Sequence, residues 1–391
     1  MIANWRRRRY VVTALGISQI VGFGTTYYLP AVLAHPIAND TGWSYTAVVS
    51  GLSLAMIVSG MVATRVGRAI ETYGGRPVLA ASAIVAAAGM AMMGLAPRLE
   101  VYLLGWFIIG LGMSAGLYDA VFSALGRLYG VTARSPISWV TLFGGFASTV
   151  CWPLSAWLVE AYGWRATCLT YAAVYLLINL PAFVVFVPDT PRRVVVAGGP
   201  PPDLEAARRH RVSLTLMMLI STVASMIAST VAVHLLAIIQ ANGVTLAAAV
   251  ALGTVLGPAQ VAGRMAELVF GSRLHPIWAT FAAVTLIAAG LAVLATGQTL
   301  AAVALILFGA GNGIYTIARG ALPLVLFDAR EYALIMGRMA MPSLIAQAIA
   351  PAIAALVMDR AGAPAVLHVL IALALANLLL VWLLYRRRVA T

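Results

Sequence analysis

Residues 67–76 read GRAIETYGGR, and residues 263–273 read GRMAELVFGSR. The two stretches share residue types in the same order, with one extra residue in the second, and begin 196 positions apart. Two further pairs have nearly the same offset: GMSAGLY at 112–118 matches GAGNGIY at 309–315, and Pro153 matches Pro351. Because half of the 391-residue chain is about as long as this offset, the sequence predicts two homologous halves.

Both repeated stretches lie between long apolar runs, as the composition of the whole chain would suggest. The chain is 62% hydrophobic and only 9% charged, whereas about a quarter of the residues in a soluble domain are charged. A membrane-spanning helix uses about 20 apolar residues, so twelve would use about 240, close to the hydrophobic content of this chain. The composition excludes a soluble enzyme, a disordered chain and a disulfide-rich secreted protein, and it predicts a polytopic membrane protein.

The apolar runs predict twelve membrane spans. The predicted fold class is an all-α membrane protein with two pseudo-symmetric six-helix bundles of transmembrane helices. We expect the N-terminal bundle at 1–187, a cytoplasmic linker at 188–211 and the C-terminal bundle at 212–391. The first apolar stretch is too long for a cleavable signal peptide. The predicted spans are 10–33, 45–64, 78–96, 101–125, 136–159, 166–187, 213–239, 245–263, 276–295, 299–323, 337–358 and 364–385.

The basic residues predict the orientation in the membrane. All 25 are Arg, and the formal net charge is +13. They gather in the loops on one side of the spans, and only Arg98, Arg165 and Arg360 are expected on the other side. Since cytoplasmic loops carry an excess of positive charge, both termini are expected in the cytoplasm, and the protein in a bacterial inner membrane. No soluble module carries these charges, so no nucleic-acid partner is expected.

The loop at 67–76 resembles the hallmark loop of the major facilitator superfamily of secondary transporters, which runs Gly-x-x-x-Asp-Arg-x-Gly-Arg-Arg. Glu71 replaces the Asp of that pattern, and Thr72 replaces its first Arg. Gly163-Trp164-Arg165 is another common feature of the family. The resemblance covers essentially the whole chain and implies twelve spans, a central linker and transport by alternating access. More loosely, the chain is similar to the monocarboxylate and oxalate/formate branch.

The repeated loops are predicted to form a cytoplasmic gate. Glycines allow tight turns between helices, and Glu71 could meet Arg76 or the N-terminus of a helix from the other half. Such contacts would hold one conformation and break in the other. The alternative is that these charges only mark the membrane boundary. The predicted gate residues are Gly67, Glu71, Gly74, Arg76, Gly263, Arg264, Glu267 and Arg273.

Two charged residues inside the spans are the leading candidates for a transport site, since each costs at least about 2.5–3.5 kcal/mol within a membrane. Asp119 lies in the fourth span and Arg319 in the tenth, and the resemblance places helices 1, 4, 7 and 10 around the transport cavity. Asp119 could exchange a proton, or form a structural ion pair or a helix cap. Arg319 could bind an anion with its planar guanidinium, pair with Asp119, or extend to the membrane surface.

Polar residues of the same helices complete the predicted substrate or proton path. His234 in the seventh span could titrate near neutral pH, although a single His in an apolar helix more often bonds to a neighbouring helix. Some of the others are expected to face the cavity and some to be interfacial aromatics. These residues are Gln19, Tyr28, Asn312 and Tyr315. Glycines in the fourth and tenth spans are expected to allow close helix packing.

The predicted function is secondary active transport of a small organic anion, either coupled to protons or by exchange. The alternative is proton-driven efflux of hydrophobic or cationic compounds, with Asp119 as the proton and cation site. A membrane scaffold or receptor, and a membrane-embedded enzyme, are less favoured. Cys151 and Cys168 both lie in apolar spans, so neither a disulfide framework nor a metal site is expected, and no cofactor either. The expected partners are the substrate, protons and the lipid bilayer, and the expected functional unit is a monomer.

Overall fold

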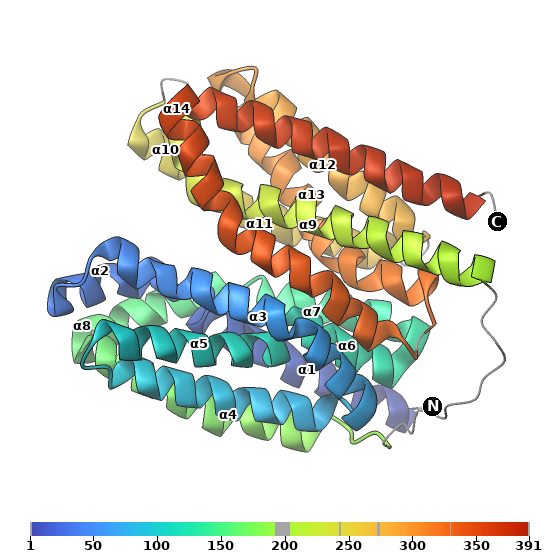
Figure 1. Ribbon diagram of the computed structural model, residues 1–391, viewed down its shortest axis with the longest axis horizontal. Helices are drawn as coiled ribbons and strands as arrows, with labels where there is room; N and C mark the ends of the chain where they lie inside the picture. The colour runs from blue at the N-terminus through green and yellow to red at the C-terminus, as the bar shows by residue number, and fades with distance from the viewer. Residues whose placement is uncertain (1, 192–203, 242–243, 272–273, 329, 390–391) are drawn as a thin grey trace. The chain divides into compact units, whose positions relative to one another are not determined.

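The computed structural model describes residues 2–191, 204–241, 244–271, 274–328 and 330–389, and its described elements are helices (Figure 1). The chain divides into two compact units. Unit 1 consists of Met1–Val195 and Asp328–Met341, and unit 2 of Val196–Phe327 and Pro342–Thr391. Half of the predicted linker, residues 192–203, lies outside the described residues, and α9 begins at Leu204.

Unit 1 is a bundle in which α4 packs along α5, α3 packs against α5, and α8 packs against α4. The last helix of the chain, α14, contributes its first turns to this unit. The elements are α1 (Ile2–Thr25), α2 (Pro30–Thr41), α3 (Tyr45–Tyr73), α4 (Gly75–Gly94), α5 (Leu99–Gly116), α6 (Tyr118–Tyr129), the 3-10 turn η1 (Gly130–Ala133), α7 (Arg134–Gly144), α8 (Ala147–Val174), and the π-helical segments η2 (Tyr175–Asn179) and η3 (Ala182–Phe186).

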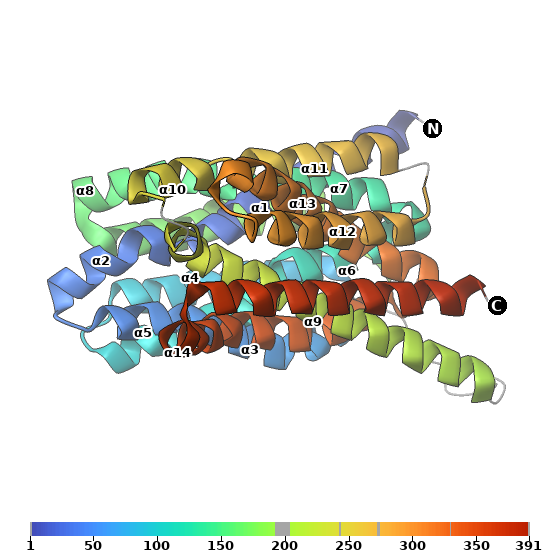
Figure 2. The ribbon, with the colours of Figure 1, turned by 90° about the horizontal axis from the view of Figure 1, so that it is seen from above.

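In unit 2, α12 packs along α13, and α11 packs against the same helix; Figure 2 shows α12 and α13 side by side. The elements are α9 (Leu204–Gln240), α10 (Leu246–Gly253), α11 (Leu256–Phe270), α12 (Pro276–Leu294), the 3-10 turn η5 (Gln298–Leu300), α13 (Ala301–Leu326) and α14 (Tyr332–Val389), whose residues from Pro342 onward belong to this unit.

Several predicted spans are not single helices. The first span consists of α1 and α2, the fourth of α5 and α6, and the eighth of α10 and α11. Conversely, α8 joins the end of the fifth span to the start of the sixth at Gly163, and α14 contains the eleventh and twelfth spans, joined at Gly362. These two glycines have nearly the same backbone angles, φ 78° and ψ 167° against φ 80° and ψ 169°. Because they are 199 positions apart, the repeat predicted from the sequence extends to backbone conformation.

Local sequence explains the turn between the first two spans. Pro30 occupies the first turn of α2, where its missing N–H is tolerated. Gly42 ends α2 with a φ of 71°, and its N–H donates to the Ala38 carbonyl. Two residues later, the Ser44 hydroxyl accepts a hydrogen bond of 3.2 Å from the Ala47 N–H and caps α3.

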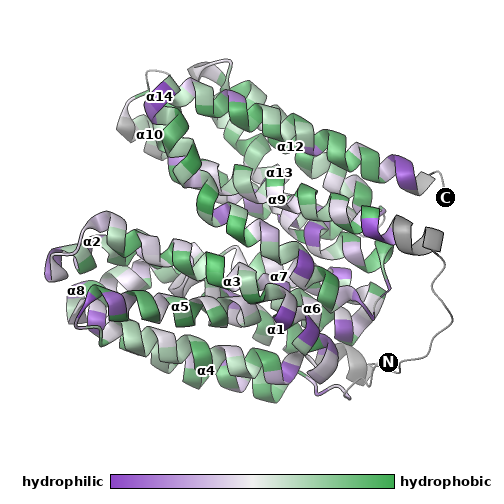
Figure 3. Cartoon of the chain, viewed as in Figure 1, coloured by the Kyte–Doolittle hydropathy of each residue, from purple (hydrophilic) through white to green (hydrophobic). Residues whose placement is uncertain are grey.

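The long helices suit a membrane. Seven helical segments of the described chain are long and apolar enough to cross one, and two of these, Leu99–Phe186 and Tyr332–Arg387, contain several predicted spans. In Figure 3 the long helices are mostly hydrophobic, and the hydrophilic segments lie mainly near their ends. Large apolar side chains such as Trp139, Trp152 and Trp157 are exposed on the surface of unit 1. Lipid would cover such side chains, whereas in water they would favour aggregation.

Glycines bring neighbouring helices into backbone contact, as predicted for the fourth and tenth spans. A Cβ atom at Gly110 of α5 would lie 2.5 Å from the Ala55 carbonyl oxygen of α3. A Cβ atom at Gly313 of α13 would overlap the Gln260 carbonyl oxygen of α11. The absence of a side chain at these positions therefore sets the distance between the helices.

Candidate functional site

The fourth span is interrupted in its middle, next to two of the predicted site residues. Leu117, between α5 and α6, has an extended backbone with φ −88° and ψ −170°. The Gln19 side chain is fully buried, and its Nε2 donates a hydrogen bond of 2.9 Å to the Gly116 carbonyl at the end of α5. Asp119 follows in the first turn of α6, half-buried. The N-terminus of a helix carries a partial positive charge, which stabilises a carboxylate there.

Tyr28 lies between α1 and α2, in an aromatic cluster. Its ring centroid lies 5.2 Å from that of Tyr27 and 6.0 Å from that of Trp152, and both contacts are edge-to-face. Trp152 is exposed on the bundle surface. The structure therefore places Tyr28 in an aromatic cluster that reaches the exposed surface of unit 1.

In unit 2, three predicted residues share one face of α13. Asn312, Tyr315 and Arg319 are separated by three and four positions, which puts them on the same side of a helix. The Tyr315 hydroxyl donates to Ser221 Oγ of α9 at 3.3 Å, so this face is turned toward α9. Arg319 is half-buried. The helix thus carries a polar stripe that ends in a guanidinium.

His234 joins α9 to α14. Its Nε2 lies 2.9 Å from the Pro351 carbonyl oxygen, within unit 2, and the side chain is half-buried. This is a hydrogen bond to a neighbouring helix, the structural alternative that the sequence offered for a single His in an apolar span.

Arg127, at the end of α6, organises the predicted gate region of unit 1. Its side chain is only 3% exposed, and its Nη1 lies 3.5 Å from Glu71 Oε1. The guanidinium also donates to the Glu71 carbonyl, to Thr190 Oγ1 at 3.0 Å and to the Pro191 carbonyl at 2.7 Å. It therefore ties α3, α6 and the chain after η3 together. The sequence suggested Arg76 or a helix N-terminus from the other half as the partner of Glu71, and it did not include Arg127 in the gate.

The turn between α3 and α4 requires glycine. Gly74 has a φ of 94° and a ψ of 166°, which residues with a Cβ atom adopt only with strain. A Cβ atom there would also collide with Thr190 Oγ1. Arg76 follows in the first turn of α4, half-buried, and makes no hydrogen bond or ion pair with another residue that the structure describes.

The first turns of α14 pack directly against α3 and α6 within unit 1. A Cβ atom at Gly67 would collide with the Ala333 carbonyl oxygen, and one at Gly337 would lie 2.5 Å from the Ala63 carbonyl oxygen. The fully buried Tyr332 ring packs against Gly126 of α6, where it occupies the space that a Cβ atom would need. The backbones of α3 and α14 therefore cross with no side chain between them. The sequence pointed to Gly67 but gave no signal for Gly126 or Tyr332.

The second copy of the gate sequence has different surroundings. Arg264 and Glu267 of α11 are both only 7% exposed, whereas Arg68, the counterpart of Arg264, is exposed. A Cβ atom at Gly263 would collide with the Ala310 carbonyl oxygen of α13. Arg273 lies outside the described residues. The repeated sequence therefore occupies two unlike environments in the two units.

At the opposite end of α3 from Glu71, a cluster of polar contacts joins helices of unit 1; we call it the polar clamp. Asp40 Oδ2 accepts hydrogen bonds from Trp164 Nε1 at 2.9 Å and from Arg165 Nη1 at 2.5 Å. Arg165 also donates to the Ala96 carbonyl at 3.3 Å and lies over the Trp164 ring at 4.2 Å. The hydrogen bond from Trp164, and then that from Arg165, hold the pKa of the Asp40 carboxyl below its usual value. The clamp joins α2, α4 and α8.

We expect Asp40→Asn to lower the melting temperature by no more than a few degrees at pH 7, because the pair is exposed to solvent. A carboxyl with a lowered pKa in the folded state stabilises the fold above its unfolded pKa, and this contribution is lost as the pH falls through the folded pKa. The difference between Asp40→Asn and the original protein should therefore stay constant from pH 7 to about pH 5 and shrink below about pH 4. Thermal unfolding at each pH measures it. Glu100→Gln, at an exposed position near the same end, is the control.

Comparisons with known proteins agree on the type of protein. The family model described as Major Facilitator Superfamily matches residues 15–318. Monocarboxylate transporter 3 of Rattus norvegicus is 34% identical over 143 residues, which are 34% of this chain and 27% of that relative. The chain thus matches about a quarter of the length of this relative.

Two solved structures match almost the whole chain. The human organic anion transporter MFSD10 (TETRAN) has a TM-score of 0.73 at 17% identity, over 96% of this chain and 99% of that one. The proton:xylose symporter XylE, bound to 6-bromo-6-deoxy-D-glucose, has a TM-score of 0.77 at 11% identity, over 97% and 96%. At these identities the similarity shows the fold alone, and it confirms the predicted twelve-helix architecture.

Proposed function

The chain belongs to the Major Facilitator Superfamily of membrane transporters, and we propose that it carries a small organic anion by alternating access, coupled to protons or by exchange. The observation that carries the proposal is the polar stripe on α13, which places the Arg319 guanidinium inside a helix of otherwise apolar composition. A guanidinium binds a carboxylate through two parallel hydrogen bonds. A charged side chain inside a membrane span is costly, so each one is a candidate for a functional role.

Two further observations support an anionic substrate. The break before α6 creates a half-helix whose positive end lies inside a span, and such ends face anionic groups in other transporters. Protonation of Asp119 in the first turn would leave this end to an anionic substrate. The partial similarity to a monocarboxylate transporter points to the same substrate class. We assign Asp119, in the first turn of α6, as the site that takes up and releases the coupled proton.

We further propose that the contacts of α14 with α3 and α6 form the cytoplasmic gate. Gly67 and Gly126 allow α14 to approach, while Arg127 and Glu71 hold the ends of α3 and α6 together. In this role the gate is closed when α14 packs on α3 and opens when they separate. The predicted gate thereby gains Gly126, Arg127 and Tyr332 as members.

The substrate class can be tested in proteoliposomes that contain the purified protein. Radiolabelled mono- and dicarboxylates and cationic dyes would be offered with and without a pH gradient. We expect saturable uptake of at least one carboxylate, stimulated by a pH gradient or by preloaded carboxylate. Transport of dyes without transport of any carboxylate would instead establish the efflux function.

The proposed orientation predicts which loops face the cytoplasm. Val131 lies in η1 after α6, and Leu95 lies at the end of α4; both are strongly exposed. In intact cells, a membrane-impermeant thiol reagent should label Leu95→Cys but not Val131→Cys. Permeabilised cells should show labelling of both. Labelling of Val131→Cys in intact cells would show that the orientation is the opposite of the one proposed. The native Cys151 and Cys168 are buried and serve as the background.

A further inference from the structure

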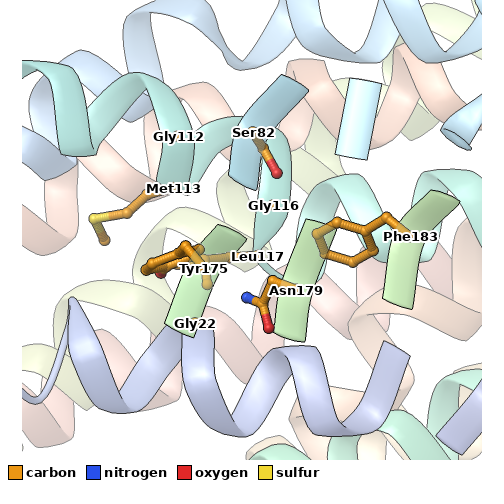
Figure 4. Close-up of a pocket in the computed structure, with 9 residues that line it drawn as sticks. All are labelled: Gly22, Ser82, Gly112, Met113, Gly116, Leu117, Tyr175, Asn179 and Phe183. Carbon is orange, nitrogen blue, oxygen red and sulfur yellow. The ribbon is translucent and has the colours of Figure 1, made fainter. Parts of the chain in front are cut away.

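A cavity lies inside unit 1, beside the break between α5 and α6. The centre of a water molecule can occupy about 10 Å³ of it. Its lining includes Gly22, Ser82, Gly116, Leu117, Tyr175 and Asn179. Figure 4 shows the Ser82 hydroxyl and the Asn179 amide projecting into the space between their helices.

The cavity exists because two helices present glycine to it. A Cβ atom at Gly22 of α1 would lie 2.9 Å from the Leu117 side chain, and one at Gly116 would lie 2.7 Å from Ser82 Oγ. The opposite wall is η2, whose π-helical turns are wider than those of an α-helix and end at Asn179. Such turns are rare and occur frequently at functional sites.

The polar groups around the cavity need a hydrogen-bond donor. Asn179 is 2% exposed, and its Oδ1 has no hydrogen-bond partner among the residues that the structure describes. The same holds for Oε1 of the fully buried Gln19, one turn before Gly22 on α1. The Ser82 hydroxyl already donates to the Leu79 carbonyl at 2.6 Å. A buried acceptor without a donor is costly, so native structures supply one from protein or from ordered water.

The same amide occurs in the second half of the chain. Asn377 in α14 is 198 positions after Asn179, the offset that also relates Pro153 to Pro351. Its exposure is likewise 2%, and its Oδ1 likewise lacks a partner within the described part of the chain. A buried, unsatisfied amide oxygen is therefore a feature of the repeat, and unit 1 combines it with a cavity and a broken helix.

We propose that this cavity is a binding site for one water molecule, which donates a hydrogen bond to Asn179 Oδ1 beside the break in the fourth span. The volume fits a single water, and a buried water needs two to four polar partners. The Asn179 amide, Ser82 Oγ and the main chain around Gly116 are available for this. The water links η2 to the interrupted helix and satisfies the amide. This site is independent of the proposed substrate class.

The test is X-ray hydroxyl-radical footprinting of the purified protein in lipid nanodiscs, read by mass spectrometry. Radicals generated from a bound water oxidise the side chains next to it. Met113 and Tyr175 line the cavity and are each only 5% exposed. We expect Met113 to be oxidised at least fivefold faster than Met90, and Tyr175 at least fivefold faster than Tyr171. Both controls are buried in unit 1 but do not line the cavity.

Variants show whether the amide holds the water. Asn179→Leu removes the acceptor at nearly constant volume and should reduce the oxidation of Met113 to the rate of Met90 and that of Tyr175 to the rate of Tyr171. Gly22→Ala keeps the amide but adds a methyl group to the wall, and the same reduction is expected; it serves as the test if Asn179→Leu does not fold. Thr170→Val, at an exposed position of α8 in the same span, should leave the rates unchanged.

Three results would overturn the proposal. Equal rates for Met113, Tyr175 and the buried controls in the original protein would exclude a bound water. Unchanged rates in a folded Asn179→Leu or Gly22→Ala variant would show that the water is not held at this site. If Met113 and Tyr175 lose their oxidation in a sodium buffer but not in a choline buffer, and sodium raises the melting temperature, the occupant is a cation.

Discussion

Arg319→Lys is expected to raise the KM for the transported anion at least tenfold while leaving the protein folded and inserted. Lys keeps the positive charge but lacks the planar, forked guanidinium that binds a carboxylate through two parallel hydrogen bonds. Tenfold corresponds to about 1.4 kcal/mol, the scale of one charge-assisted hydrogen bond. The measurement is the concentration dependence of uptake into proteoliposomes at matched protein content.

A matched control is the same substitution at a surface Arg. Arg338 lies on α14 and is exposed, so Arg338→Lys should transport with an unchanged KM. If Arg319→Lys also has an unchanged KM, Arg319 does not bind the substrate, and the anion proposal loses its main support.

Asp119→Asn distinguishes the two candidate functions in the same assay. Under anion transport, the variant should lose stimulation by a pH gradient but still exchange internal for external substrate, because the anion binds at Arg319. Under efflux of cationic compounds, Asp119→Asn should abolish both binding and coupling, and Arg319→Lys should have little effect. The pair of variants therefore identifies the sign of the substrate charge.

The fold was predictable because its signals are repeated along the chain. The matching stretches at 67–76 and 263–273 indicated two halves, and Gly163 and Gly362 show that the repeat extends to backbone angles. Apolar length fixed the number of spans, since a helix in lipid needs about 20 apolar residues. These properties depend on composition and spacing, which a single sequence contains.

The break at Leu117 was not predictable in this way. Leu is a good helix former, and nothing in its side chain indicates an extended backbone. At the break the chain makes tertiary contacts, among them the hydrogen bond from Gln19 to the Gly116 carbonyl. Sequence reasoning therefore placed Asp119 inside a continuous helix, whereas the structure places it in the first turn of a new one.

The contacts of the proposed gate were predictable only in part for the same reason. Gly67 and Glu71 belong to a local sequence pattern, but the residues that contact them across the bundle do not. Tyr332 is more than 200 positions away from Gly126 in sequence, and their contact follows from how α14 packs. In the sequence, Arg127 cannot be distinguished from other basic residues at the ends of spans. Its four contacts are evident only in the structure.

The proposed gate contact between α3 and α14 predicts that a larger side chain at Gly67 will impair transport. Gly67→Val should reduce transport at least tenfold, because the new side chain would occupy the position of the Ala333 carbonyl. Main-chain atoms cannot rotate away as a side-chain end can, so α3 and α14 must separate. The variant should therefore remain folded but favour the conformation in which the cytoplasmic gate is open.

Accessibility of a cysteine reporter tests this directly. Ala333 is 1% exposed, so Ala333→Cys should react slowly with a thiol reagent added from the cytoplasmic side. Combined with Gly67→Val, it should react at least tenfold faster. Gly257→Val is the matched control, since a Cβ atom at Gly257 of α11 meets no atom within 4 Å; it should change neither transport nor labelling. Slow labelling in Gly67→Val, with transport intact, would mean that α14 can pack on α3 despite the added side chain, and would remove this contact from the gate.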